Sequence, residues 1–380
     1  MESDGEGGLQ EDWAVVERLL PAGWEAKARE LGALRRTRRF SDASSLLRVM
    51  LVHLAEGCSL RETAVRVAQG GLAQVSDVAL LKRLRNCGPW FQWLGVELMR
   101  QWVSLQPQAV FGVQRVRVVD GTTVSEPGAT GSSWRLHYAV RLPGLECDEV
   151  HVTEPSVGET LRRFTVVRGE VLIADRGYAQ PAGIAYVKRH GGEVIVRLNL
   201  GNVPLEGPRG GTFAVLAHLR TLGPTTLGDW PVRVAGKGEG VAARLCAVRK
   251  SVAAATAARA RAAKDSAHKG HRVRPETLEA ADYIVVLTTL DARTPAATVL
   301  EMYRGRWQIE LAFKRLKSLL QLGHLKKTDP LAAQAWLQGK LLVSLLIAAL
   351  MAAAERFSPW GYPLQDPAAS LSLARDLVHA

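Results

Sequence analysis

Cysteine is scarce in this chain. Its 380 residues include four cysteines, at positions 58, 87, 147 and 246, and no two of them form a C-x-x-C pair. The spacing argues against a structural zinc site, and so small a number argues against a disulfide scaffold. The cysteine content therefore indicates a protein of a reducing compartment.

A secretion signal and a membrane-spanning run are lacking as well. The segment from Met1 to Gln10 is acidic and glycine-rich, which is the opposite of a signal peptide. The most apolar run, Leu341–Ala354, contains Ser344 and is too short to cross a bilayer. We expect this run to be a buried helix of a soluble cytoplasmic protein that has no membrane partner.

Acidic residues are outnumbered: 37 Asp and Glu stand against 49 Lys and Arg, which leaves a net charge of +12. With 47% apolar and 23% charged residues the composition is that of a globular protein, which excludes a disordered, collagen-like or coiled-coil chain. The length predicts two or three domains. The basic excess favours a polyanionic partner, usually nucleic acid, over a protein that is merely basic and soluble.

Helical patterns dominate residues 1–110. Ser41-Asp42 precedes a periodic apolar run that stops at Gly57, and Ser59-x-x-Glu62 is a capping box that opens a second helix. Gly70-Gly71 ends that helix, and Ser76-Asp77 starts a third, basic one. Two short helices around a glycine turn are typical of a helix-turn-helix that reads DNA; a helical packing or dimerisation domain is the alternative.

Residues 111–198 mix strands and helices. Val113–Val119 alternates like a strand and ends on Asp120, and the apolar strand Val171–Ala174 ends on Asp175. Ligands of α/β sheets bind at the carboxyl ends of strands, so we expect Asp120 and Asp175 to share a site. Ordinary turn chemistry of Asp and Gly is the alternative.

Residues 199–282 differ from this pattern because glycine and proline are frequent between short apolar runs. This composition predicts an inserted, mostly β module. From Arg244 to Arg274 there are nine Lys and Arg and one acidic residue, Asp265. This basic stretch either lines a nucleic-acid channel or forms a solvated helix. The fold resumes with the strand Tyr283–Leu287, and Pro295 opens a long helix.

The long helix carries a polar stripe beside a separate apolar one for the core. At about 100° per residue, four polar side chains fall within a stripe about 60° wide: Tyr303, Arg306, Glu310 and Lys317. An exposed face of salt bridges is the alternative interpretation of this stripe.

The spacing from Tyr303 through Arg306 and Glu310 to Lys317 resembles the Y-R-E-K signature of bacterial insertion-sequence transposases of the insertion sequence 4 family. The sequences Arg306-Trp307-x-Ile309-Glu310 and Phe313-Lys314 are also similar to that family, as are Asp120-Gly-Thr-Thr and Asp175-Arg-Gly-Tyr after their strands. The order Asp, Asp, Glu resembles the family's DDE catalytic triad, and the long β-rich insertion before the Glu helix is a family feature. The resemblance covers about residues 40–350.

The resemblance implies an α/β fold with an RNase H-like mixed-sheet catalytic core over residues 111–198 and 283–355. A β-rich insertion with a basic tail, residues 199–282, interrupts this core. An all-α N-terminal DNA-binding domain, residues 1–110, precedes it, and a C-terminal tail, residues 356–380, follows it.

By motif position, the resemblance assigns catalysis and metal binding to Asp120, Asp175 and Glu310. The DNA contacts that it implies are Tyr303, Arg306, Trp307, Lys314, Lys317, Arg197 and Arg176. Phosphodiester chemistry needs an activated oxygen and a stabilised leaving oxygen, which two Mg²⁺ ions supply, and Mn²⁺ can substitute. Converging carboxylates would repel one another without such ions, so the triad predicts a divalent cation. The sequence contains no H-E-x-x-H motif, which argues against zinc.

The implied function is that of a transposase that binds terminal inverted repeats and catalyses metal-dependent DNA cleavage and strand transfer into target DNA. We expect a homodimer on double-stranded DNA, associated with the bacterial nucleoid. The alternatives are a catalytically inactive DNA-binding relic, which magnesium-dependent nicking would exclude, and another RNase H-like nuclease, which joining activity would exclude.

Overall fold

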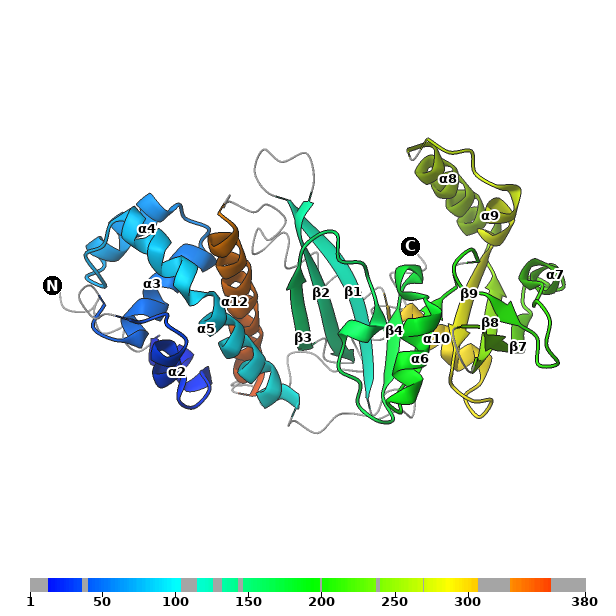
Figure 1. Ribbon diagram of the computed structural model, residues 1–380, viewed down its shortest axis with the longest axis horizontal. Coiled ribbons are helices and arrows are strands. Elements are labelled where there is room, and N and C mark those ends of the chain that lie inside the picture. Colours follow the sequence, from blue (N-terminus) through cyan, green and yellow to red (C-terminus); the bar gives the residue numbers. More distant parts are fainter. Residues whose placement is uncertain are drawn as a thin grey trace.

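The computed structural model describes residues 13–35, 40–103, 115–125, 132–142, 146–198, 200–236, 240–268, 270–306 and 329–356. This part of the chain is elongated (Figure 1). N-terminal helices lie at one end, a large sheet occupies the centre, and a unit of strands with projecting helices forms the other end.

The N-terminal region is helical, as the sequence predicts. Its elements are α2 (Trp24–Glu30), α3 (Ala43–Ala55), α4 (Leu60–Gln69) and α5 (Asp77–Val103). Of the capping box predicted at Ser59 the structure shows one half: the Ser59 hydroxyl accepts from the Glu62 amide, whereas the Glu62 carboxylate accepts from Arg66. A full capping box begins α3, where the Asp42 carboxylate accepts from the Ser45 amide. The expectation of a short third helix is wrong, because α5 continues for 27 residues, through Pro89.

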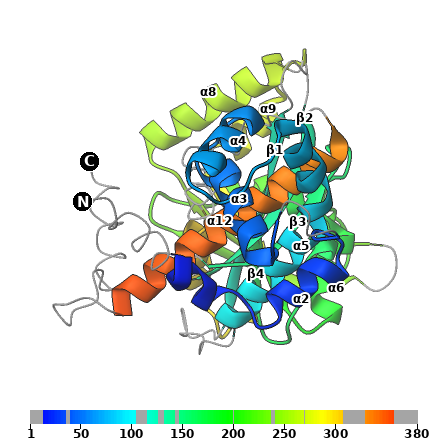
Figure 2. The same ribbon diagram turned by 90° about the vertical axis from the view of Figure 1, so that its left-hand side faces the viewer.

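Helix α12 (Pro330–Arg356) packs against α5 and α3, although it lies some 250 residues away in the sequence (Figure 2). Its stretch Pro330–Leu350 is long and apolar enough to span a membrane, but most of it is buried inside the protein. The prediction of a buried helix over its apolar run is therefore confirmed for the described side chains.

One mixed sheet holds all nine strands that the structure describes. The strands are β1 (Val116–Ser125), β2 (Ser132–Leu142), β3 (Glu146–Thr153), β4 (Val171–Ala174), β5 (Glu193–Arg197), β6 (Leu205–Glu206), β7 (Leu227–Val234), β8 (Val241–Arg249) and β9 (Tyr283–Thr288). Their order is β3-β2-β1-β4-β5-β9-β8-β7-β6. Strands β1, β4 and β5 are parallel, and every other pairing is antiparallel. The predicted mixed α/β class is thus confirmed.

The strands of residues 199–282 do not form a sheet of their own. They extend the central sheet through β9, which pairs with β5 on one side and with β8 on the other. The helices of this stretch are α7 (Val215–Arg220), α8 (Val252–His268) and α9 (Pro275–Ala280). The last two follow β8 and project from the sheet.

Two hydrophobic layers cover the faces of the sheet. The 3-10 turn η1 (Leu161–Arg163), the turn η2 (Arg176–Tyr178) and α6 (Pro181–Arg189) pack on one face, against side chains such as Val119 and Leu172. Helix α10 (Ala296–Arg304) packs with the other face, which presents Val118 and Ile173.

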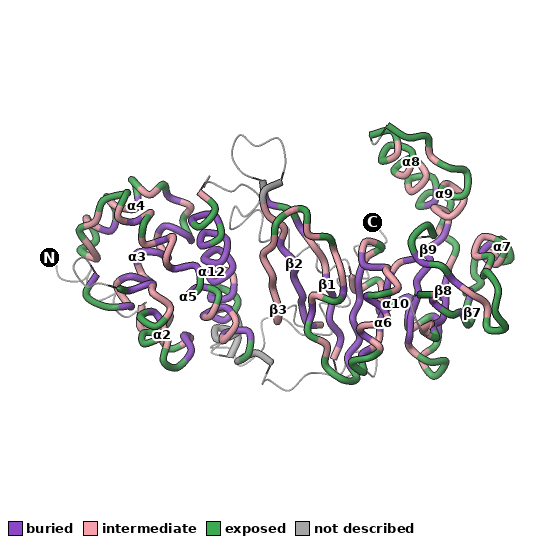
Figure 3. Tube along the Cα trace, viewed as in Figure 1, coloured by how far each residue is buried: buried purple, intermediate pink, exposed green. Residues whose placement is uncertain are grey.

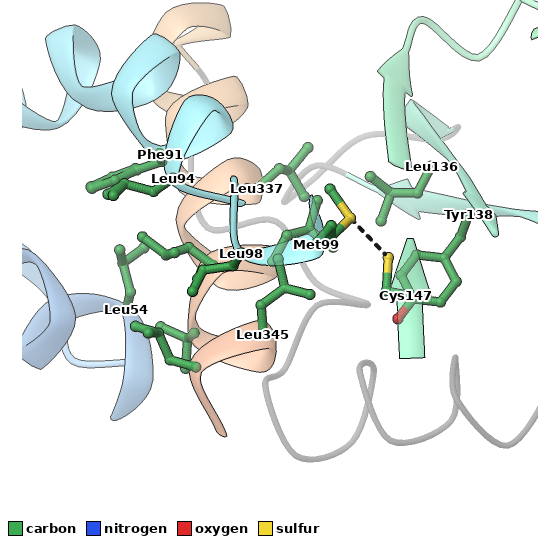
Figure 4. Close-up of a cluster of buried hydrophobic side chains, with 14 of the residues drawn as sticks. Leu54, Phe91, Leu94, Leu98, Met99, Leu136, Tyr138, Cys147, Leu337 and Leu345 are labelled. Atoms are coloured by element: carbon green, nitrogen blue, oxygen red, sulfur yellow. Dashed lines mark hydrogen bonds between the residues drawn. The ribbon is translucent and has the colours of Figure 1, made fainter. Parts of the chain in front are cut away.

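The second layer also joins the sheet to the N-terminal helices. Figure 4 shows this junction, where α5 and α12 meet strands β2 and β3. The thiol of Cys147 on β3 lies 3.6 Å from the sulfur of Met99 on α5, with Leu98, Leu136 and Leu337 buried around them. The helices and the sheet therefore share one core.

Candidate active site

Asp120 and Asp175 lie at the same edge of two neighbouring parallel strands. Strand β4 pairs with β1 only as far as Val119 and Ala174. Asp120 is the next residue of β1, and Asp175 directly follows β4. The expectation that this strand ends on Asp120 is wrong, because β1 continues to Ser125 through its antiparallel pairing with β2.

Both aspartates and Arg197 belong to one face of the sheet. Side chains of a strand alternate between faces, and Val118, Ile173 and Ile195 belong to the layer that includes α10. Asp120, Asp175 and Arg197 each stand two residues further along β1, β4 and β5. The structure therefore brings these three predicted site residues together.

Backbone amides orient the two carboxylates. The amide of Gly121 donates to Oδ1 of Asp120 at 2.7 Å, and the amide of Gly177 donates to Oδ1 of Asp175 at 2.7 Å. In each case the donor is the glycine of the motif itself, one or two residues after the acid. Each carboxylate is thereby fixed through one of its oxygens.

The electrostatics of the site disfavour an ionised Asp120. Burial raises its pKa to about 7, and the charges of Asp175 and Glu159 act in the same direction. The hydrogen bond from Gly121 and the Arg306 guanidinium, 3.8 Å from Oδ2, lower it less. A divalent cation would relieve this repulsion, and carboxylate oxygens are the ligands that Mg²⁺ prefers.

The aspartate pair is an incomplete metal site by itself. No cluster of three or more His, Cys, Asp or Glu side chains suited to a metal occurs among the residues that the structure describes. The predicted third ligand, Glu310, lies outside them, as do Trp307, Lys314 and Lys317. The two carboxylates fit a hard cation that takes a further oxygen ligand from elsewhere in the chain.

Cationic and phenolic side chains from β5, from α10 and from the residues just after α10 flank the pair. The Arg306 guanidinium lies 5.9 Å from the centre of the Tyr303 ring. Burial raises the pKa of Tyr303, whereas the charges of Arg306 and Arg197 lower it. Three of the predicted DNA contacts therefore lie beside the aspartates.

The long helix that Pro295 was expected to open is shorter than predicted. Helix α10 ends at Arg304, and the Gly305 amide donates to the Met302 carbonyl. Glycine is a weak helix former, and a Cβ at this position would lie 3.1 Å from the same carbonyl oxygen. Tyr303 is thus inside α10, whereas Arg306 follows its end.

Arg176 is placed differently from the other predicted contacts. It is exposed at the start of η2, directly after Asp175, and forms no ion pair with any described residue. Its guanidinium is available to a solvent-side anion next to the aspartates.

Glu159 is a site residue that the sequence did not reveal. A Cβ on Gly121 would lie 2.9 Å from one of its carboxylate oxygens, and a Cβ on Gly177 would overlap the other. Burial and the charge of Asp175 raise the pKa of Glu159. Burial and the charges of all three acids also raise the pKa of Tyr178, whose hydroxyl has no hydrogen-bond partner within the described structure.

Comparison with known proteins shows that this chain is similar to transposases. The family model described as "Transposase DDE domain" matches residues 112–346. A putative transposase InsL for insertion sequence element IS186A of Escherichia coli K12 is 36% identical over 358 residues, covering 92% of this chain and 96% of the relative. The transposase for insertion sequence element IS421 of Escherichia coli is 35% identical over 359 residues, with the same coverage.

These matches show the class: the chain belongs to the DDE transposases. Such a domain implies an RNase H-like fold and an enzyme that depends on divalent metal to cut and join DNA. Within this class, the resemblance to the insertion sequence 4 family is confirmed, because the relatives over nearly the whole chain are insertion-sequence transposases.

Proposed function

We propose that Asp120, Asp175 and Glu310 are the catalytic carboxylates of this transposase and that they hold two Mg²⁺ ions, for which Mn²⁺ can substitute. When bound, the ions would activate the attacking oxygen and stabilise the leaving oxygen of a DNA phosphodiester. The observation that carries the proposal is the convergence of Asp120 and Asp175 on one face, where burial and mutual repulsion raise the pKa of Asp120 to about 7.

The flanking side chains bind the DNA backbone in this proposal. Arg306 and Arg197 neutralise phosphates beside the aspartates, and the half-buried Tyr303 ring supports the Arg306 guanidinium. Arginine is suited to this role because its planar fork binds phosphate through two donors. The remaining proposed contacts with DNA are Arg176, Trp307, Lys314 and Lys317.

At the level of domains, we propose that residues 111–198 and 283–355 form the catalytic core and that residues 199–282 are an insertion into it. Residues 1–110 bind the inverted repeats at the transposon ends, and residues 356–380 are a tail. The chain acts as a homodimer on nucleoid DNA in the bacterial cytoplasm and joins the cut ends to target DNA. The basic net charge supports such a partner.

Replacing Asp175 with Asn tests the catalytic site. The amide keeps the shape of the side chain but removes a charged metal ligand, so we expect Mg²⁺-dependent nicking of a transposon-end duplex to fall at least about 100-fold. Gel-shift binding of the same duplex should be largely retained. Asp291→Asn is the matched control, since Asp291 is exposed and its carboxylate is paired with Arg293.

Nicking by the Asp175→Asn protein at the wild-type rate would contradict the proposed site. A wild-type protein that binds ends but nicks with neither Mg²⁺ nor Mn²⁺ would be the inactive relic. Nicking without joining of the 3′-hydroxyl to a second duplex would instead indicate another RNase H-like nuclease.

A further inference from the structure

Helix α8 is almost entirely exposed. Of its 17 residues only Ala255 is buried, and Val252 is 84% exposed. Figure 3 shows the helix standing away from the body of the protein, with green and pink dominating its surface. Its nine alanines favour the helical conformation. The ion pair of Arg259 with Asp282 attaches the helix to the rest of the protein. A helix that buries so little of itself is free to serve a partner.

The position of α8 is set by the sheet. Strand β8 runs antiparallel to β9, and β9 runs antiparallel to β5. Strand β8 therefore has the same direction as β5, β4 and β1, so its carboxyl end lies at the sheet edge that holds Asp120 and Asp175. Helix α8 begins three residues after that end, and Figure 1 shows it projecting there with α9.

Basic side chains connect the aspartates to α8. Arg306 lies beside Asp120, and the charges of Arg306 and Arg197 both lower the pKa of Tyr303. Lys250, between β8 and α8, donates to the Ala281 carbonyl at 2.6 Å, which fixes its position. Burial lowers the pKa of Lys250 to about 8, and so do the positive charges of Arg197 and Arg261. The charge of Asp282 raises the pKa of Lys250. Lys250 therefore lies within range of the positive charges of Arg197 on β5 and Arg261 on α8.

Helix α8 continues this series of basic side chains away from the sheet. At about 100° per residue, Arg261, Lys264 and His268 fall within a stripe about 60° wide. All three are exposed, and neither Arg261 nor Lys264 forms an ion pair within the described part of the chain. Ala262 and Ala263 separate Arg261 from Lys264, so a bulky partner can approach the helix backbone there, and Asp265 is the one acidic residue of α8.

We propose that α8 is a DNA-binding arm: Arg261 and Lys264, continued by Lys250 and Arg197, bind phosphates of the duplex whose scissile bond lies at Asp120 and Asp175. Contacts to phosphates position a duplex and carry no sequence information, so the arm binds DNA of any sequence. This inference rests on the proposed function and extends DNA contact beyond the active site onto the insertion.

The test compares two double variants that lose the same charge. Arg261→Gln/Lys264→Gln removes the cations of the arm. Arg168→Gln/Arg189→Gln removes two exposed cations at the opposite sheet edge, because Arg168 precedes β4 and Arg189 ends α6 before β5. Fluorescence anisotropy gives the affinity of the full-length proteins for a transposon-end duplex and an unrelated duplex of equal length, over a range of salt and without divalent ions.

Each phosphate contact contributes about 0.9 to the slope of log affinity against log salt. We expect the arm variant to lose about 1–2 units of slope on both duplexes, and the control variant to keep the wild-type slope. Circular dichroism should show the same thermal midpoint for all three proteins, because the substituted side chains are exposed.

An unchanged slope in the arm variant, or an equal loss in the control, would overturn the arm and leave a solvated helix. A loss restricted to the end duplex would overturn binding without sequence preference. Since the binding assay needs no metal, it decides the arm even if the wild-type protein fails to nick in Mg²⁺, which would defeat only the proposed catalytic site.

Discussion

Asp120 is protonated over a pH range in which most aspartates are ionised, because it is buried beside other acids. Its pKa in the folded, metal-free protein is about 7, whereas an unfolded chain gives about 3.9. The stability that this proton binding contributes is fully present below the unfolded pKa and is lost as the pH rises through 7. The stability that a bound cation contributes has the opposite pH dependence, since the cation competes with the proton for the Asp120 carboxylate.

The first prediction concerns this competition. Mn²⁺ should raise the thermal midpoint of the protein more at pH 8 than at pH 6, because the cation must displace the proton of Asp120 at the lower pH. Glu159→Gln removes a neighbouring negative charge, which lowers the pKa of Asp120, so the pH at which Mn²⁺ stabilisation is half-maximal should fall. Differential scanning fluorimetry across pH measures both effects.

Asp120→Asn is the control for that experiment. The neutral amide removes the titration, so the metal-free midpoint of this variant should depend less on pH between 6 and 8, and Mn²⁺ should no longer stabilise it. Equal stabilisation of the wild-type protein by Mn²⁺ at both pH values would contradict the assignment of Asp120 as a ligand.

Among single site residues, the sequence predicted those that a local motif marks. Asp120 and Asp175 each precede a motif glycine, and this pattern predicted both positions. Glu159 lies in a loop with no strand end or helical stripe to mark it. It reaches Gly121 and Gly177 only because η1 packs beside β1 and β4, which is a long-range contact that no local pattern predicts.

Strand β1 is anchored by a buried charge three residues before Asp120. Arg117 is 1% exposed and forms ion pairs with Asp148 at 3.0 Å, Glu149 at 2.7 Å and Glu170 at 3.4 Å. It also donates to the Thr165 carbonyl at 2.7 Å. This network connects β1 to β3 and to the segment that leads into β4, so it fixes the two strands that carry the aspartates.

Arg117→Ala should destabilise the protein by about 3–5 kcal/mol, because it removes the buried cation that pairs with all three carboxylates and leaves only Arg115 to pair with Asp148 and Glu170. The change in the free energy of unfolding is measured by urea denaturation. Arg304→Ala is the matched control: the Arg304–Glu301 pair is solvent-exposed, and its loss should cost less than about 1 kcal/mol. Equal effects of the two substitutions would show that the buried network contributes no special stability.

Elements with a strong local pattern were predicted closely, but the ends of two of them were not. The apolar run of β4 gave its bounds correctly, whereas β1 continues past Asp120 because β2 pairs with it there. Helix α10 ends earlier than its periodicity suggests, since Gly305 closes it. In both cases the end is decided by a partner or a backbone preference that the apolar pattern does not contain.

On the scale of the molecule, one hydrophobic cluster extends from the N-terminal helices through the sheet. It includes Cys87 on α5 and Cys246 on β8. Burial raises the pKa of each thiol to about 12, which keeps both unreactive while the protein is folded. The two cysteines therefore report unfolding at two distant places in the same core.

We expect Cys87 and Cys246 to become reactive at the same urea concentration in pulsed thiol labelling read by mass spectrometry. Leu98→Ala, at the junction of α5 with the sheet, should lower the stability by about 2–5 kcal/mol and shift both cysteines equally. A shift of Cys87 alone would contradict a single cooperative core and show that the helices unfold independently of the sheet.

The helical end of the molecule has a consequence for its synthesis. Helices α3 and α5 are made early, but α12, against which they pack, begins at Pro330. During synthesis, their apolar surfaces cannot pack against α12 until almost the entire polypeptide has been translated. A chain that stops before Pro330 lacks α12, so it cannot bury the surfaces of α3 and α5 that this helix covers.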